Sequence, residues 1–262
     1  MCDVISERGV LIKEIHNVNK WYHIRWWKLL ILVVVFIGIG MGVYLKPYAP
    51  DATALEAMKS SNGVTVIEQR QWIQFDPNNT VGPSVIFYPG GLVEPESYAP
   101  MAKELAIQGH RTYIVKMPLN LAVIGGDRAD AILTAEPNET FVIGGHSLGG
   151  VMASRFAASH PDRIAGVFFL AAYPDSKGSL QEKDVPVLSL IGSDDGLVEE
   201  DTYETAKQYL PLNTEYYVIE DGNHAQFGSY GPQKGDNPAK ITYEEQLQTM
   251  IERLTEWMDI LE

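Results

Sequence analysis

The chain has 262 residues, 45% of them hydrophobic, which suits one medium-sized domain with an appendage. Residues 47–262 hold 31 of the 34 acidic residues but only 14 of the 20 basic ones. A domain this acidic repels phosphate backbones, which argues against nucleic acid as a partner. The only cysteine is Cys2, so an intrachain disulfide and a cysteine-based metal site are both excluded.

The first element along the chain is an apolar segment. Residues 29–45 are 17 consecutive uncharged and mostly apolar residues between Lys28 and Lys46. As a helix they would extend about 26 Å, the short end of what a bilayer core requires. The segment is apolar all round, which argues against a core helix with a single buried stripe. Aromatic residues typical of a membrane interface flank it: Trp21, Tyr22, Trp26, Trp27, Tyr44 and Tyr48.

A cleaved signal peptide is the alternative for this segment. The 28 residues before it are too long for an n-region, and no small-x-small cleavage site follows. The basic residues that precede the segment place the N-terminus in the cytoplasm. We therefore expect a short cytoplasmic segment at 1–28 and a single-pass signal anchor in the cell membrane at 29–46. A tether at 47–61 would then lead to an extracytoplasmic domain at 62–262.

The rest of the chain alternates between strand-like and helix-like segments. The strand-like segments are 64–75, 84–88, 112–117, 140–144, 165–171, 186–191 and 215–220, and the helical patterns are 98–108, 126–135, 148–159, 199–209 and 243–261. Several strands are continuous β-branched or aromatic runs, as expected when both faces are covered. The pattern predicts an α/β fold with a mostly parallel sheet flanked by helices. The segment 64–75 alternates more and predicts an antiparallel edge.

The sequence "GGHSLGG" at 144–150 contains a G-x-S-x-G motif between a predicted strand and a predicted helix. On such a turn the serine hydroxyl projects above the sheet. The positions two before and two after the serine must be small because strand and helix pass closely there, and they are Gly145 and Gly149. The motif therefore makes Ser147 a candidate nucleophile, and the alternative is a packing turn with an incidental serine.

A serine nucleophile needs a base, and the base needs an orienting acid. His224 directly follows the last predicted strand, so its loop can reach the serine. His146 is adjacent to Ser147, but neighbouring side chains diverge at a sharp turn, which favours a structural role for it. Asp194 and Asp195 both follow the strand 186–191 and remain alternatives as the acid. Asp175, one strand earlier, is a weaker candidate.

Taken together, residues 62–262 resemble the α/β-hydrolase fold family, in particular compact lidless bacterial serine hydrolases and esterases. "GGHSLGG" is similar to the family's nucleophile elbow, "GSDDGLV" to its G-x-x-D acid loop and "DGNHAQF" to its terminal histidine loop. The resemblance implies an eight-stranded, mostly parallel sheet. It also implies that the acid stands three residues after Gly192, which selects Asp195. The chain order Ser147, Asp195, His224 is the order that this family uses.

The stretch "FYPGGLVEPESY" occupies the position of the family's oxyanion loop, with Tyr88-Pro89 where His-Gly is common. The resemblance implies that the oxyanion donors are the backbone N–H of Leu148 and that of Gly91 or Leu92. Only residues 173–185 separate the sixth and seventh strands, too few for a cap. Pocket candidates are Leu119, Leu121 and Gln226, with helix packing as the alternative for the leucines.

These features predict a membrane-anchored carboxylesterase that acts on a small-molecule ester through Ser147, His224 and Asp195. A serine at the nucleophile position excludes chemistry based on an aspartate or cysteine nucleophile. No cluster has metal-ligand spacing, so we expect neither a metal nor a cofactor. The alternatives are a non-catalytic surface binding module or, among enzymes, a thioesterase, lipase or peptidase.

Overall fold

The structure, a computed structural model, describes residues 26–36 and 46–261. The chain divides into two units, Met1–Lys46 and Pro47–Glu262. In the first unit, residues 26–36 are helical and exposed. The rest of the predicted cytoplasmic segment, and residues 37–45 of the predicted anchor, lie outside the described residues. Within the described ranges, no helix combines the length and apolar character that crossing a membrane requires.

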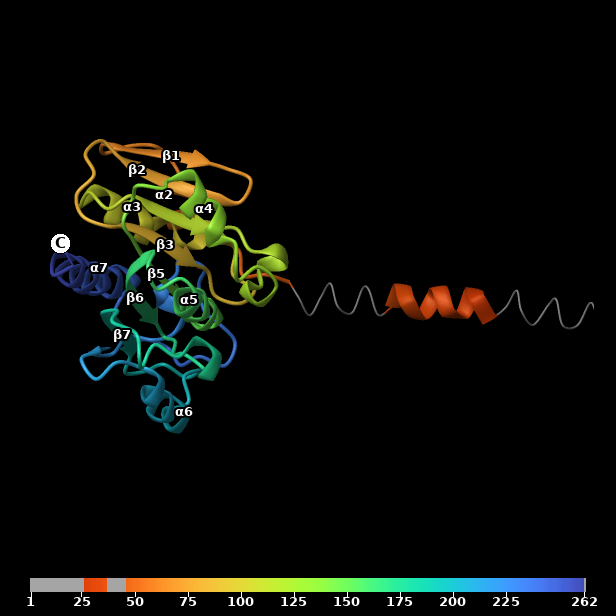
Figure 1. The fold of residues 1–262 in the computed structure, drawn as a ribbon. Coiled ribbons are helices and arrows are strands. Elements are labelled where there is room, and N and C mark those ends of the chain that lie inside the picture. The colour runs from red at the N-terminus through yellow and green to blue at the C-terminus, as the bar shows by residue number, and fades with distance from the viewer. Residues whose placement is uncertain (1–25, 37–45, 262) are drawn as a thin grey trace, which may run out of the picture. The chain divides into compact units, whose positions relative to one another are not determined.

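The second unit is built on an eight-stranded sheet with the order β1-β2-β4-β3-β5-β6-β7-β8 (Figure 1). The strands are β1 (Val64–Glu68), β2 (Trp72–Pro77), β3 (Ser84–Tyr88), β4 (Thr112–Val115), β5 (Phe141–His146), β6 (Ile164–Leu170), β7 (Val187–Gly192) and β8 (Glu215–Ile219). Strands β3 to β8 are parallel, and β2 pairs antiparallel with both β1 and β4. The predicted α/β fold with a mostly parallel sheet is therefore confirmed.

The predicted strand at 64–75 is an antiparallel edge, as expected, but it is two strands and not one. The chain folds back at residues 69–71, where the N–H of Gln69 donates to the carbonyl of Trp72 at 2.9 Å. Val66 then pairs with Phe75 across the hairpin. The turn contains no Gly, Pro, Asn or Asp, and the period-two pattern continues in both arms. Neither signal that normally reveals a hairpin is therefore present in the sequence.

Helices cover both faces of the sheet. They are α2 (Ala52–Ala57), α3 (Ala99–Ile107), α4 (Ala129–Ala135), α5 (Leu148–Ser159), α6 (Glu200–Ala206) and α7 (Tyr243–Asp259). Short 3₁₀ turns accompany them: η1 (Pro95–Tyr98), η2 (Pro118–Asn120), η3 (Ala122–Ile124), η4 (Ser176–Gly178), η5 (Lys207–Tyr209) and η6 (Ala225–Phe227). The buried side chains of α3 and α7 belong to one core cluster, and those of α4 and α5 belong to a second.

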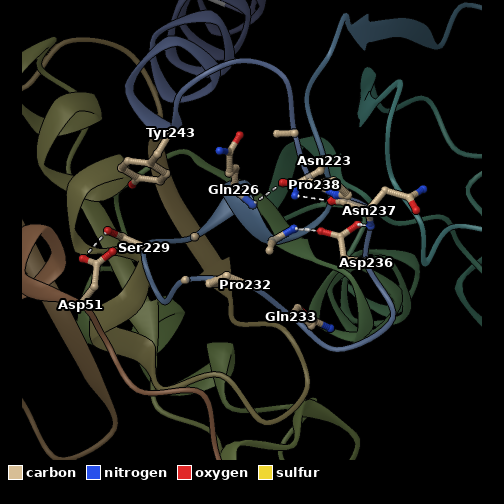
Figure 2. Close-up of a pocket in the computed structure, with 14 residues that line it drawn as sticks. Asp51, Asn223, Gln226, Ser229, Pro232, Gln233, Asp236, Asn237, Pro238 and Tyr243 are labelled. Atoms are coloured by element: carbon tan, nitrogen blue, oxygen red, sulfur yellow. Dashed lines mark hydrogen bonds between the residues drawn. The ribbon is translucent and has the colours of Figure 1, made fainter.

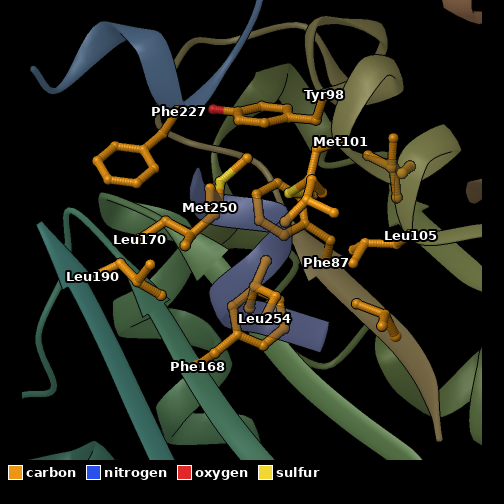
Figure 3. Packing of buried hydrophobic residues seen from close by; sticks show 14 of the residues in the cluster. Phe87, Tyr98, Met101, Leu105, Phe168, Leu170, Leu190, Phe227, Met250 and Leu254 are labelled. Atoms are coloured by element: carbon orange, nitrogen blue, oxygen red, sulfur yellow. The ribbon is translucent and has the colours of Figure 1, made fainter. Parts of the chain in front are cut away.

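The two clusters divide the side chains of the central strands between the two faces. In β3, Phe87 joins the cluster of α3 and α7, whereas Ile86 and Tyr88 join the cluster of α4 and α5. Figure 3 shows the first cluster, with Met250 and Leu254 of α7 packed among the side chains of the strands. All five residues of β3 are buried, which explains why its sequence does not alternate.

Residues 47–61, which the sequence suggests as a tether, fold with the domain. They contain α2, where Ala54 is fully buried and Asp51 accepts a hydrogen bond from the Ala54 N–H at 3.0 Å. An N-cap of this kind satisfies a backbone donor that the helix itself leaves unpaired. The compact unit therefore begins at Pro47 and not near residue 62.

Candidate active site

Ser147 stands on the turn between β5 and α5. Its backbone has φ 51° and ψ −124°, a strained conformation for a residue that carries a side chain. A Cβ on Gly149 would lie 2.1 Å from the carbonyl oxygen of Tyr88, and a Cβ on Gly145 would lie 2.6 Å from the same oxygen. Since no side chain fits at either position, the two glycines allow α5 to begin directly beside the end of β3.

His224 follows β8 and is paired with Asp195. Its Nδ1 lies 2.8 Å from Asp195 Oδ2, and each of the two side chains is only 3% exposed. The other carboxylate oxygen, Oδ1, accepts the backbone N–H groups of Leu197 at 2.8 Å and Val198 at 2.9 Å. These amides hold the carboxylate so that Oδ2 faces the imidazole. A proton on Nδ1 then leaves the lone pair of the neutral ring on Nε2.

The His224 ring packs against His146, which precedes Ser147 on the turn between β5 and α5, which we call the nucleophile turn. The ring centroids of His146 and His224 are 4.5 Å apart, which brings His224 beside the residue that precedes Ser147. His224 Nε2 is buried and has no hydrogen-bond partner, and the structure has no hydrogen bond from Ser147 Oγ to it. In enzymes without substrate such bonds are often long, and they tighten only in the reactive complex.

The other two candidate acids point elsewhere. Asp194 lies on the surface, where its Oδ2 is 2.8 Å from Lys240 Nζ. Asp175 is ion-paired with Arg155 and accepts the backbone N–H groups at the start of η4. Only Asp195 among the three contacts His224, in agreement with the choice that the family resemblance makes.

His146 is a buried link between the nucleophile turn and the turn after β3. Its Nδ1 lies 2.8 Å from the Tyr98 hydroxyl, which in turn accepts the Gly90 N–H at 3.0 Å. Burial raises the pKa of the Tyr98 phenol, so this hydroxyl keeps its proton and donates it to His146 Nδ1. The neutral His146 ring is therefore protonated on Nε2. Burial, with a smaller contribution from His224, holds the pKa of His146 well below its ordinary value of 6.5.

The predicted oxyanion donors have different surroundings. Leu148 is the first residue of α5, so no carbonyl within the helix is available to its N–H. A Cβ on Gly91 would lie 3.1 Å from the Leu148 side chain, which places the turn after β3 against the start of α5. The N–H of Leu92 already donates to the Asn120 carbonyl at 2.7 Å. Leu92 is thus unavailable as a donor, and Gly91 remains of the two predicted alternatives.

The three pocket candidates have different surroundings. Leu119 has φ 52° and is 71% exposed, and Leu121 is half-buried. Gln226 lines a cavity of about 430 Å³ (Figure 2). Asp51, Tyr243 and residues of the loop that follows His224 also line it. Neither Leu119 nor Leu121 lines this cavity.

Asp236 is a residue of the site that the sequence analysis missed. Its Oδ2 accepts the Ala225 N–H at 2.8 Å (Figure 2), and its Oδ1 accepts the Gly196 N–H at 3.0 Å. One carboxylate thus joins the loop of Asp195 to the loop of His224. In the sequence, Asp236 is an acidic residue in a Gly- and Pro-rich stretch, a pattern shared by many solvent-exposed turns. Only the folded path of the two loops reveals its role.

Among the residues that the structure describes, no group of three or more His, Cys, Asp and Glu side chains could hold a metal ion.

Solved structures with the same fold include several hydrolases. A predicted CIB-like hydrolase from Thermoplasma acidophilum has a TM-score of 0.57 at 15% identity, covering 74% of this chain and 100% of its own. A novel esterase from Mycobacterium tuberculosis has 0.56 at 13% identity, covering 79% and 97%. A carboxylesterase from Bacillus subtilis has 0.55 at 12% identity, covering 79% and 94%. Identities this low establish the fold alone.

The sequence itself identifies the family. Residues 84–248 match the family model described as "Alpha/beta hydrolase family", whereas no curated protein sequence matches the chain. The matched region begins at β3 and ends within α7, so it includes the nucleophile turn, the acid loop and the histidine loop. Because the match spans more than half of the chain, the protein belongs to the alpha/beta hydrolase family.

Proposed function

We propose that this protein is a serine hydrolase, and specifically a carboxylesterase. Ser147 is the nucleophile, His224 the general base and acid, and Asp195 the residue that orients the imidazole. The observation that carries the proposal is the buried Asp195–His224 pair beside a serine with a strained backbone at the start of a helix. This set of groups is what acyl transfer to a serine hydroxyl requires.

In the proposed reaction, Ser147 Oγ attacks the ester carbonyl carbon and its proton passes to His224 Nε2. The oxyanion that forms lies against the N–H groups of Leu148 and Gly91, near the positive end of the α5 dipole. When this tetrahedral intermediate collapses, the alcohol leaves with the proton from His224, and an acyl-serine remains. Water then attacks the acyl carbon, with His224 again accepting the proton, and the carboxylic acid is released. Asp195 stabilises the imidazolium in both steps.

An ester of small molecular size is the proposed substrate. Between β6 and β7 the only regular structure is the three-residue turn η4, so no cap domain is inserted between these two strands. Two of the proteins that share the fold are named as an esterase and a carboxylesterase, which supports the choice of an ester. A thioesterase, a lipase or a peptidase would use the same chemistry, so activity assays must distinguish these alternatives from a carboxylesterase.

A fluorophosphonate probe tests the proposal directly. The wild type and a Ser159→Ala control, which removes a serine hydroxyl from the far end of α5, are expected to be labelled. The Ser147→Ala variant is expected to remain unlabelled and to lose ester hydrolysis. A wild type that takes no label would contradict the serine hydrolase and favour the binding module. Chromogenic esters, thioesters and peptides of graded chain length then define the substrate.

The proposal includes anchoring to the cell membrane through residues 29–46, with the N-terminus in the cytoplasm. It rests on the uncharged segment, its aromatic flanks and the basic residues before it. Protease added to intact cells is expected to digest the hydrolase domain, and alkaline carbonate is expected to leave the full chain in the membrane. Protection from protease in intact cells that is lost on permeabilisation would reverse the orientation.

A further inference from the structure

The two turns that would form the site's oxyanion and base regions are far apart in the sheet. Gly91 follows β3 and His224 follows β8, and β5, β6 and β7 lie between these strands. No pairing of neighbouring strands therefore sets the distance between the two turns. The segment 47–51, which we call the N-terminal strap, contacts both.

On one side the strap is paired with the turn after β3. The N–H of Tyr48 donates to the Leu92 carbonyl at 2.7 Å, and the Glu94 N–H donates to the Tyr48 carbonyl at 3.0 Å. Tyr48 and Val93 thereby form a short parallel bridge. Since Leu92 is the residue next to Gly91, this pairing fixes the turn that carries the proposed oxyanion donor.

On the other side the strap holds the far end of the histidine loop, residues 222–241. The Tyr48 ring packs on Tyr230 with centroids 5.5 Å apart, and its hydroxyl accepts the Lys234 N–H at 3.1 Å. The Asp51 N–H donates to the Ser229 carbonyl at 3.0 Å, and the Ser229 hydroxyl donates to Asp51 Oδ1 at 2.7 Å (Figure 2). The strap therefore contacts the loop at two separate places.

The histidine loop has little structure of its own to keep it in place. Its one regular element is the three-residue turn η6. Tyr230 is nevertheless only 8% exposed, since it belongs to the core cluster of α3 and α7 and the Tyr48 ring packs on it. A loop of this length would lose considerable conformational entropy on ordering, and contacts at its far end offset that loss. Besides the strap, the Ser229 N–H donates to the Ser97 carbonyl at 2.7 Å.

We infer that Tyr48 and Asp51 are positioning residues, which hold the turn of Gly91 and the loop of His224 at the separation that catalysis needs. The inference rests on the proposed function for its kinetic consequence, although not for its structural one. Neither residue touches the reacting atoms. Their effect is on the geometry of the transition state, where a displacement of about 1 Å can cost about 100-fold in rate.

The kinetic test compares strap variants in the full-length protein. Tyr48→Ala is expected to lower kcat for a chromogenic ester by about 10- to 100-fold, with KM changed less than about twofold. Tyr48→Phe keeps the ring on Tyr230 and loses only the hydroxyl, so its kcat should stay within about threefold of wild type. Glu56→Ala, on the exposed side of α2, is the matched control and should leave kcat unchanged.

Asp51→Ala and Ser229→Ala complete the kinetic test as a double-mutant cycle. The double variant is expected to be no slower than Asp51→Ala alone, because both single changes remove the same hydrogen bond. All rates are divided by the number of active sites, counted by complete labelling with fluorophosphonate. A strap that only stabilised the fold would lower the number of labelled sites and leave kcat per site at the wild-type value, and this result would overturn the inference.

Hydrogen–deuterium exchange separates this inference from the proposed function. In Tyr48→Ala, amides of residues 90–94 and of residues 224–234 are expected to exchange faster, while those of α7 keep their wild-type rates. Unchanged exchange in either of the two turns would refute the strap, whatever the activity. If the wild type hydrolysed no ester but showed this exchange pattern, the proposed function would fail and the structural role of the strap would stand.

Discussion

The nucleophile turn, which carries Ser147, and the histidine loop supply the two halves of the proposed active site, but they are ordered in opposite ways. The nucleophile turn has β5 directly before it and α5 directly after it, and its shape follows from close contact between backbones. The histidine loop has only η6 as regular structure. It is held by the distant side chains of Asp195, Tyr48 and Asp51, and by Asp236 within the loop, whose carboxylate also accepts the N–H of the distant Gly196.

Substitutions in the two regions should therefore affect activity and stability in different ways. A side chain at Gly149 would clash with the Tyr88 carbonyl oxygen, and the closely packed backbones of strand and helix leave it no space, so a substitution in the nucleophile turn should abolish activity altogether. The histidine loop is held by several separate hydrogen bonds, each of modest net value. Removing one of them should displace the imidazole without unfolding the domain. The following variants test this contrast, starting with the largest expected effect.

Gly149→Ala should have the largest effect, because its Cβ would lie 2.1 Å from the Tyr88 carbonyl oxygen. We expect a loss of about 3 kcal/mol or more in unfolding free energy and no fluorophosphonate labelling. Gly231→Ala is the matched change in the histidine loop, where φ is 80° but no atom lies within 4 Å. It should cost about 1 kcal/mol and keep its labelling. Urea unfolding measures both, and equal losses would erase the contrast between the two regions.

Asp195→Asn should lower kcat by about 10⁴-fold while the domain stays folded, because an amide supports the wrong imidazole tautomer. Asp194→Asn loses only a surface ion pair with Lys240, and its kcat should remain close to that of the wild type. Steady-state kinetics on a chromogenic ester measure both variants, and circular dichroism checks that each is folded. A larger loss in Asp194→Asn would show that the acid is the other aspartate.

Asp236→Asn should lower kcat by about 10-fold, since an amide still accepts hydrogen bonds but more weakly than a carboxylate does. Asp221→Asn, at the residue that immediately precedes this loop, is the control, because the Asp221 carboxylate reaches only the exposed Lys240 at 3.3 Å. Kinetics per labelled site, at fixed pH, compare the two. If both variants matched the wild type, the bridge from Gly196 to Ala225 would not contribute to positioning His224.

A smaller effect is expected on how the free energy of unfolding depends on pH. Because the pKa of His146 is lowered in the folded protein, the unfolded chain takes up this proton first, at about pH 6.5. Stability from the neutral, buried ring is therefore complete above pH 6.5 and declines as the pH falls below it, by up to about 1.4 kcal/mol per pH unit. His146→Gln removes this titration, so urea unfolding between pH 7 and 5 should show a shallower decline. If the unfolding free energy of the wild type and of His146→Gln declined equally with falling pH, the prediction would be wrong.

Several elements of the fold and of the candidate site can be predicted from neighbouring residues alone. The strand, turn and helix around Ser147 are readable because buried strands, glycine spacing and helix starts are properties of adjacent residues. The position of His224 after the last strand is readable for the same reason. The parallel sheet followed from the alternation of strands and helices, and the resemblance to a known family chose Asp195 over Asp194.

Other features depend on contacts between distant segments, and they become visible only in the folded chain. Leu92 and Gly91 are equivalent in the sequence, but the carbonyl of Asn120 occupies the N–H of Leu92 alone. Asp236 and the strap likewise have no local signature, because their roles come from where two remote loops pass each other. Local propensity specifies how a segment is shaped, whereas the packing of the whole chain specifies which backbone groups remain free and which side chains hold the loops together.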